Sequence, residues 1–283
     1  MTASYELVER PDLESPVLVL ALDGWIDAGF GAANARTALL DGLETLTVAV
    51  FDSDELLDHR ARRPVMNLVE GVNTGLTWPS IELLAASDGD GNDLLLLVGA
   101  EPDHSWRAFS GAVVDLALEL GVRVTVGLGA YPAPVPHTRP VRLAVAATSE
   151  ELAEPGSWMR ATVDVPAGIQ AAIERRCAEI GLPAVGLWAQ VPHYAAAMPY
   201  PGASAALVDG LADVGGLVLD SADLHAQAAT TRRRLDALIA DNEEHRRMVH
   251  QLEEQADAAE SGDSGLGLGP SPSGDELVAE LER

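Results

Sequence analysis

Residues 18–40 read LVLALDGWIDAGFGAANARTALL, in which an apolar strand passes through a short loop of small residues and aspartates into an alanine-rich helix. A continuous apolar strand followed by such a helix is typical of a sheet that is covered on both faces. Further strands and helices follow from the same patterns: strands at 46–51, 94–99, 122–129 and 185–191, and helices at 32–43, 106–120 and 169–180. This alternation predicts an α/β fold with three layers, α/β/α, around a mostly parallel or mixed sheet.

The loop at the start of this unit is not a phosphate loop. Its glycine spacing imitates one, but Phe30 and Gly31 occupy the places of the required lysine and of the serine or threonine. Asp27 already brings negative charge to the start of the helix, where it can cap backbone N–H groups. We interpret the loop as a structural corner, and anion binding by the helix N-terminus is the alternative.

A second turn is expected at SDGDGN, between apolar segments at 76–86 and 93–98. It predicts a hairpin, which adds an antiparallel edge to the sheet. The neighbouring letters DGDGND (88–93) resemble a calcium loop, but Asp93 stands where that loop needs glycine and Gly99 where it needs glutamate. We therefore expect a solvated turn.

Charge and composition exclude several classes of function. The 283 residues carry 44 acidic and 18 basic side chains, a net charge of −26, and every basic residue is an arginine. Without lysine the chain cannot form a Schiff base or a serine-lysine dyad. Because phosphate contacts need clustered positive charge, we expect no nucleic-acid partner.

The sequence also bears on compartment. Cys177 is the single cysteine, so neither an intrachain disulfide nor a cysteine-based zinc site can form. No apolar run approaches the roughly 20 residues that cross a bilayer, and the N-terminus lacks a secretory pattern. We expect a cytoplasmic protein with no membrane contact.

Polar side chains gather where the expected strands end, which is where open parallel sheets bind ligands. Glu101, Asp103 and His104 follow one strand, and Tyr131 and Thr138 lie after another. The candidate ligand pocket consists of seven residues from these ends: Asp23, Trp25, Asp27, His137, Arg139, His193 and Tyr194. Because no metal-ligand spacing such as H-E-x-x-H is present, we predict neither a metal nor a cofactor.

The C-terminal part has a different texture from residues 1–219, which we take as the α/β/α domain. Residues 220–260 read as one long helix with apolar residues at alternating intervals of four and three. That spacing favours a self-association seam over a helix packed on its own domain. The seam consists of Leu235, Leu238, Asn242, Val249 and Leu252. A flexible linker is expected at 261–274 and a short amphipathic segment at 275–283.

Several motifs, in this order and spacing, resemble those of the PAC2 family: LDGWIDAG, WPSIELLAA, GAEPDHSWRAFSGAVVDLALELGV, GLGAYPAPVPHTRP and GLPAVGLWAQVPHYAAAMPYPGASAAL. The resemblance covers about residues 1–260. It implies a three-layer fold similar to that of the nucleoside phosphorylases, a homo-oligomer and, for some relatives, a role in proteasome assembly.

Two functions follow as hypotheses. The first is a non-enzymatic oligomer, with a trimer as the working expectation, that acts through protein contacts and has the proteasome as a candidate partner. The second is a hydrolase or phosphorylase of a nucleoside-like small molecule at the strand ends, because the implied fold hosts such chemistry.

Overall fold

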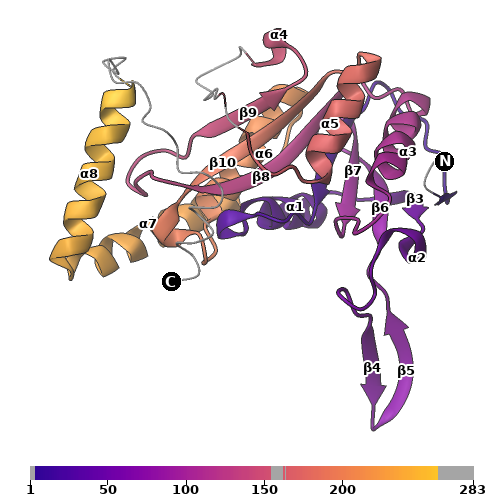
Figure 1. Cartoon of the computed structure of the whole chain (residues 1–283), viewed down its shortest axis with the longest axis horizontal. Coiled ribbons are helices and arrows are strands. Elements are labelled where there is room, and N and C mark those ends of the chain that lie inside the picture. Colours follow the sequence, from indigo (N-terminus) through magenta and orange to yellow (C-terminus); the bar gives the residue numbers. More distant parts are fainter. Residues whose placement is uncertain (1–3, 154–161, 163, 261–283) are drawn as a thin grey trace.

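The computed structural model describes residues 4–153, 162 and 164–260, and its centre is an eight-stranded mixed sheet (Figure 1). The strands lie in the order β1-β3-β6-β7-β2-β8-β10-β9. Their bounds are β1 Tyr5–Leu7, β2 Val17–Leu22, β3 Leu46–Phe51, β6 Ile81–Ser87, β7 Asp93–Gly99, β8 Val124–Ala133, β9 Leu143–Ala147 and β10 Ala184–Pro192. The four central strands β7, β2, β8 and β10 are parallel, and the outer pairings are antiparallel. The predicted α/β fold with a mixed sheet is confirmed.

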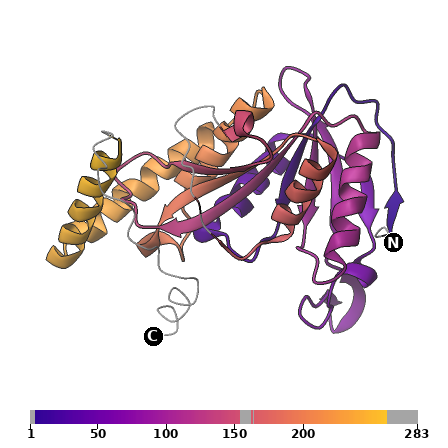
Figure 2. The same ribbon diagram turned by 45° about the horizontal axis from the view of Figure 1, so that its top comes forward.

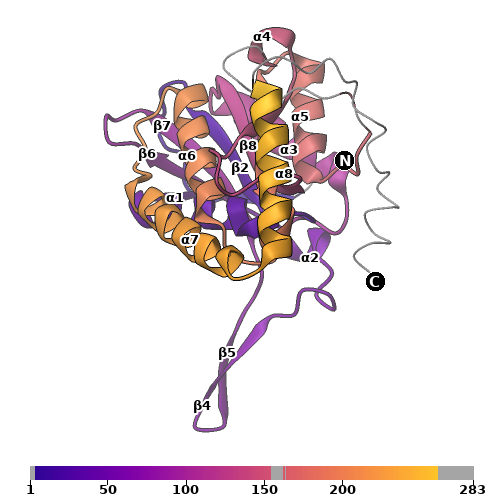
Figure 3. The same cartoon turned by 90° about the vertical axis from the view of Figure 1, so that its left-hand side faces the viewer.

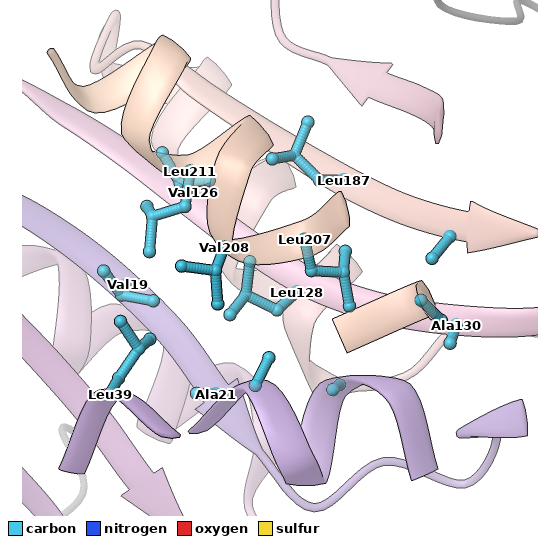
Figure 4. Close-up of a cluster of buried hydrophobic side chains, with 14 of the residues drawn as sticks. Val19, Ala21, Leu39, Val126, Leu128, Ala130, Leu187, Leu207, Val208 and Leu211 are labelled. Atoms are coloured by element: carbon cyan, nitrogen blue, oxygen red, sulfur yellow. The ribbon is translucent and has the colours of Figure 1, made fainter. Parts of the chain in front are cut away.

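Helices cover both faces of this sheet, which makes three layers (Figure 3). On one face lie α1 (Gly31–Gly42) and α6 (Pro201–Gly215), and on the other lie α3 (Trp106–Glu119) and α5 (Ile169–Ile180). Successive residues of β2 point to opposite faces. Val17 and Val19 therefore join the core under α1 and α6, and Leu18 and Leu20 join the other core. Figure 4 shows the first of these cores, where Val208 of α6 meets side chains of β2 and β8.

The predicted SDGDGN hairpin joins β6 to β7. Asp88 organises its turn, because its carboxylate accepts hydrogen bonds from the backbone N–H groups of Asp90 and Asn92 and from the Asn92 side chain. The same carboxylate accepts from the Val218 N–H, just after α6. The turn thus fastens one end of α6 to the sheet.

A second hairpin, not expected from the sequence, projects from the body of the molecule (Figures 1 and 3). It consists of β4 (Val65–Val69) and β5 (Val72–Thr77), which pair with each other and with no other described strand. The short helix α2 (Ser53–Leu56) precedes it. We call residues 65–77 the arm.

The long helix predicted over 220–260 is interrupted. The structure has α7 (Ala222–Ala240) and α8 (Glu243–Glu260), separated at Asp241 and Asn242. The reason is local, because the Asn242 side chain accepts hydrogen bonds from the N–H groups of Glu244 and His245 and so starts a new helix. Figure 2 places α8 at the opposite end of the molecule from β1.

The predicted seam divides accordingly. Leu235 of α7 belongs to the core under α1 and α6, and Val249 and Leu252 of α8 are also buried within the chain. Leu238 is left 59% exposed. Three seam residues therefore pack on their own chain, and self-association along the seam stays a prediction. The expected linker at 261–274 and terminal segment at 275–283 lie outside the described residues.

The remaining short elements are the 3-10 turns Ala28–Phe30 and His193–Ala195 and the helix α4 (Glu150–Ala153). Within the described part of the chain, the helices are all too short or too polar to span a bilayer.

Candidate functional site

A cleft of about 350 Å³ lies at the carboxyl end of β2. It arises because β2 leaves the sheet at Leu22 while its neighbour β8 continues to Ala133. The loop from β2 to α1 and the first turns of α1 and α5 line it, with Gly129 of β8 at its base. We call it the strand-end cleft, and its position is the one that ligands favour in open α/β sheets.

Asp27 shapes the corner of the cleft. One carboxylate oxygen accepts from the Ala32 N–H at 2.8 Å and the other from the Ala33 N–H at 2.9 Å. The predicted capping role of Asp27 is therefore present. Burial raises the pKa of this carboxyl, and the hydrogen bonds from α1 offset part of that effect.

The corner itself is held tightly. Gly29 adopts φ +64°, donates its N–H to the Ala196 carbonyl, and accepts from the Tyr200 N–H. Its neighbour Phe30 has φ +52°, an uncommon conformation for a bulky residue, and its half-exposed ring lines the cleft. Strained backbone of this kind persists where the surroundings enforce it, and it clusters at functional sites.

Charged side chains at the mouth are largely paired. Arg36 of α1 forms an ion pair with Asp23 at 2.7 Å and also donates to the Ala21 carbonyl. Trp25 lies between Asp23 and Asp27 in the sequence. It lines the cleft and is 54% exposed.

Glu101 reaches the cleft from the segment after β7. The residue is only 8% exposed, and its Oε1 accepts from the Ile169 N–H at 2.8 Å, at the start of α5. Glu101 thus caps α5 from a distant part of the sequence. Gly168 lies between the Glu101 carboxylate and the Trp25 indole, and a side chain there would crowd both.

Beneath α5 the sheet has a floor of glycines. Gly127 and Gly186 lie side by side on β8 and β10, and Gln170 and Glu174 of α5 occupy the space that their side chains would fill. Gln170 donates to Glu174 at 2.9 Å and also lines the cleft. Burial raises the pKa of Glu174 to about 7, although the hydrogen bond from Gln170 lowers it.

His137 and Tyr194 form a separate cluster. The Tyr194 hydroxyl accepts from the His137 backbone N–H at 2.8 Å and lies 2.7 Å from His137 Nδ1. The hydroxyl proton is therefore free to point at Nδ1, which leaves Nε2 to donate to Asp236 of α7 at 3.2 Å. Burial lowers the pKa of His137, and the hydrogen bond to Asp236 opposes this.

Arg139 fastens the same loop to α8. Its guanidinium donates two hydrogen bonds of 2.7 Å to Asp257 and one of 3.2 Å to Glu253. Both carboxylates raise the pKa of Arg139. The carboxylates of Asp236 on α7 and of Glu253 and Asp257 on α8 thus accept the hydrogen bonds that His137 and Arg139 donate from the loop after β8. We call His137, Arg139, Asp236, Glu253 and Asp257 the helix junction.

The seven candidate residues therefore fall in two places. Asp23, Trp25 and Asp27 line the strand-end cleft. The other four candidates, all within the described part of the chain, do not line it. His137 and Arg139 belong to the helix junction with Tyr194, and the exposed His193 stacks edge-on against the Tyr194 ring. The acid–base candidates and the cleft are thus separate features.

Sequence reasoning did not assign roles to Arg36, Gln170, Glu174 or Trp188, which complete the cleft or its floor. Glu101 was noted as a strand-end residue, but its contact with Ile169 spans 68 residues and has no local signal. Across residues 4–153, 162 and 164–260, no group of three or more His, Cys, Asp or Glu side chains is arranged to hold a metal ion.

The fold defines a three-layer α/β/α protein with a parallel centre to its sheet and a cleft at the strand ends. Comparison with known proteins identifies this class more closely. A model of the PAC2 family matches residues 21–239, so the chain belongs to the PAC2 family. A comparison with curated proteins finds no match.

Solved structures agree with the family assignment. A Mycobacterium tuberculosis protein of unknown function is 38% identical, with a TM-score of 0.84, over 93% of this chain and 92% of its own. A Corynebacterium glutamicum protein of unknown function is 33% identical, with a TM-score of 0.84, over 90% and 97%. A proteasome-assembly chaperone homologue from M. tuberculosis is 34% identical, with a TM-score of 0.76, over 82% and 99%.

Proposed function

We propose that this chain is a non-enzymatic homo-oligomer that acts through protein contacts in a proteasome-related assembly step. The observation that carries the proposal is the arm, whose apolar side chains have no cover within the described chain. Each of the following is 45–64% exposed: Val65, Met66, Leu68, Val69, Val72 and Leu76.

Both faces of the arm are apolar. Met66 pairs with Leu76, so these two side chains share one face, whereas Val69 pairs with Val72 near the tip. A lone two-stranded hairpin is marginally stable in water. Contiguous exposed apolar side chains usually mark a protein interface. A partner that covers the arm accounts for both facts.

Charge points to a second copy of the chain as that partner. The segment that leads into the arm carries Arg60, Arg62 and Arg63, whereas the whole chain has a net charge of −26. The arm itself carries Glu70 and no basic residue, and Arg62 pairs with Asp103 at 3.2 Å. Arg60 and Arg63, at the base of the apolar arm, are therefore the cations that can meet the acidic surface of another copy. We take a trimer as the assembly to test.

The proteasome link rests on family membership and on the relative described as a proteasome-assembly chaperone homologue. Proteins that guide assembly need exposed recognition surfaces, which the arm supplies. The enzymatic alternative has less support, because His137 and Arg139 are engaged by carboxylates of α7 and α8 and do not line the cleft.

The test of the proteasome link is sedimentation velocity of the full chain mixed with purified actinobacterial proteasome core subunits at about 10 μM, where micromolar affinity is measurable. We expect a complex that sediments faster than either component. The matched comparison is an arm variant with Met66→Ser, Leu68→Ser and Leu76→Ser. Independent sedimentation of wild type and subunits would overturn the proteasome link while leaving self-association to be judged separately.

A further inference from the structure

We propose that the strand-end cleft binds a guanidinium group, carried by a small molecule or by an arginine side chain of a peptide, against Glu101 and Trp25. This inference goes beyond the assembly function and does not depend on it. It rests on the state of Glu101, on the aromatic walls, and on the pairing of every other charge in the cleft.

Glu101 has unused acceptor capacity in a buried place. The residue is 8% exposed and lines the cleft, and its Oε1 accepts from the Ile169 N–H. Its Oε2 makes no hydrogen bond to any residue in the described chain, and it is not one of the fully buried atoms that lack a partner, so it stays accessible from the cleft. A ligand that donates hydrogen bonds to Oε2 would use this free acceptor capacity.

The other charges of the cleft are already matched. Both oxygens of Asp27 accept from N–H groups of α1, and Asp23 neutralises Arg36 at 2.7 Å. Glu101 is therefore the group that sets the charge preference. With three carboxylates and one arginine in its lining, the cleft favours a cation and disfavours a phosphate.

The walls suit a flat cation. A Cβ added at Gly168 would lie 3.1 Å from Glu101 Oε1 and 3.4 Å from Trp25 Cδ1, so the carboxylate and the indole both border this glycine. Trp188 and Phe30 add two more rings to the lining. A guanidinium is planar, stacks on indole faces and donates a fork of hydrogen bonds to a carboxylate.

Gln170 supplies a further acceptor. Its amide nitrogen donates to Glu174, and its amide oxygen has no hydrogen bond within the described residues. The Gln170 side chain lines the cleft, so this oxygen is available to a ligand there. A guanidinium carries five N–H donors and can serve Glu101 and Gln170 together. The volume of about 350 Å³ is at the lower end for small-ligand sites, so it holds one such side chain.

The test is isothermal titration of the full chain with N-acetyl-arginine amide, and with the neutral isostere N-acetyl-citrulline amide. We expect the arginine compound to bind at least about tenfold more tightly, because citrulline has the same shape without the charge. Agmatine and an arginine-bearing pentapeptide, titrated in parallel, distinguish a small-molecule source from a peptide source. Equal binding of the arginine and citrulline compounds, or no heat from either, would overturn the proposal.

Glu101→Gln is the decisive variant, because its amide oxygen can still accept from the Ile169 N–H. We expect its affinity for N-acetyl-arginine amide to fall at least about tenfold. Glu179→Gln, which alters a half-exposed carboxylate at the other end of α5, is the matched control and should bind as wild type does. Trp25→Ala is a second test, at an exposed position where a substitution should not disturb folding, and it should also weaken binding. It keeps the proposal testable if Glu101→Gln folds poorly. Unchanged binding by folded Glu101→Gln would contradict the proposal.

Discussion

The carboxylate of Asp88 accepts a 2.7 Å hydrogen bond from the Val218 N–H, 130 residues further along the chain. This bond ties the β6–β7 turn to the end of α6, and three more hydrogen bonds hold the same carboxylate within the turn. One buried side chain thus sets the geometry of two distant segments.

Replacing Asp88 should therefore be costly. We expect Asp88→Ala to lower the free energy of unfolding by about 2–3 kcal/mol, because it leaves several N–H groups without an acceptor. Asp90→Ala, at an exposed position in the same turn, should change it by less than about 0.5 kcal/mol. Urea unfolding monitored by circular dichroism measures both, and equal effects would contradict the role given to Asp88.

Asp88 should also make stability depend on acidity. Burial by itself raises the pKa of this carboxyl, but its hydrogen bonds prevail and hold the pKa at about 2. The folded pKa lies below the unfolded value of about 3.9, so the stabilisation is present above about pH 4 and lost as pH falls towards 2. The free energy of unfolding should drop less over this range in Asp88→Asn than in wild type, and parallel curves would count against the assignment.

Glu174 should act in the opposite sense. Burial raises its folded pKa to about 7, above the unfolded value of about 4.3, so the folded state binds the proton more tightly. Its effect is to lower stability as pH rises from about 4 through 7. Glu174→Gln keeps a partner for Gln170 and should be more stable than wild type at pH 8, by an amount that shrinks at pH 5. Glu179→Gln serves as the control and should show no such trend.

The corner at Gly29 should tolerate no side chain. Its φ is +64°, and an added Cβ would lie 2.6 Å from the Tyr200 Cβ. Gly216→Ala isolates the conformational part of the cost, since Gly216 has φ +55° and open space around it. We expect about 1–2 kcal/mol for Gly216→Ala and clearly more for Gly29→Ala in thermal unfolding. Similar losses would mean that the contact with Tyr200 is loose.

The helix junction should hold α8 in place. Arg139→Ala removes three hydrogen bonds to Glu253 and Asp257, so hydrogen exchange at residues 243–259 should accelerate. Arg175→Ala removes an exposed ion pair on α5 and should leave α8 unchanged. Wild-type exchange rates in Arg139→Ala would show that packing alone docks the helix.

The sequence predicted those elements whose pattern is set by burial. Strand β3 and helices α1, α3 and α5 appear within two residues of their expected bounds, because each buries apolar side chains in one of the two cores. The arm was missed because its apolar side chains are exposed on both faces and therefore show no alternation of apolar and polar residues.

The cleft was predictable only in part, for a topological reason. Asp23, Trp25 and Asp27 were found because they directly follow an apolar strand. Glu101 and Gln170 join them because β7, β2 and β8 are neighbours, and that order is not encoded in any local pattern. The break at Asn242 had a local signal, since an asparagine before two glutamates is a helix N-cap as readily as a seam position.

The molar mass of the full chain by light scattering on a sizing column tests the central claim most directly. At about 10 μM we predict an oligomer, with the mass of a trimer as the specific expectation, and a shift towards the monomer for Met66→Ser/Leu68→Ser/Leu76→Ser. The control Leu118→Ser/Val165→Ser/Val218→Ser changes three exposed apolar side chains outside the arm and should keep the wild-type mass. A monomeric wild type, or an arm variant with undiminished mass, would contradict the account.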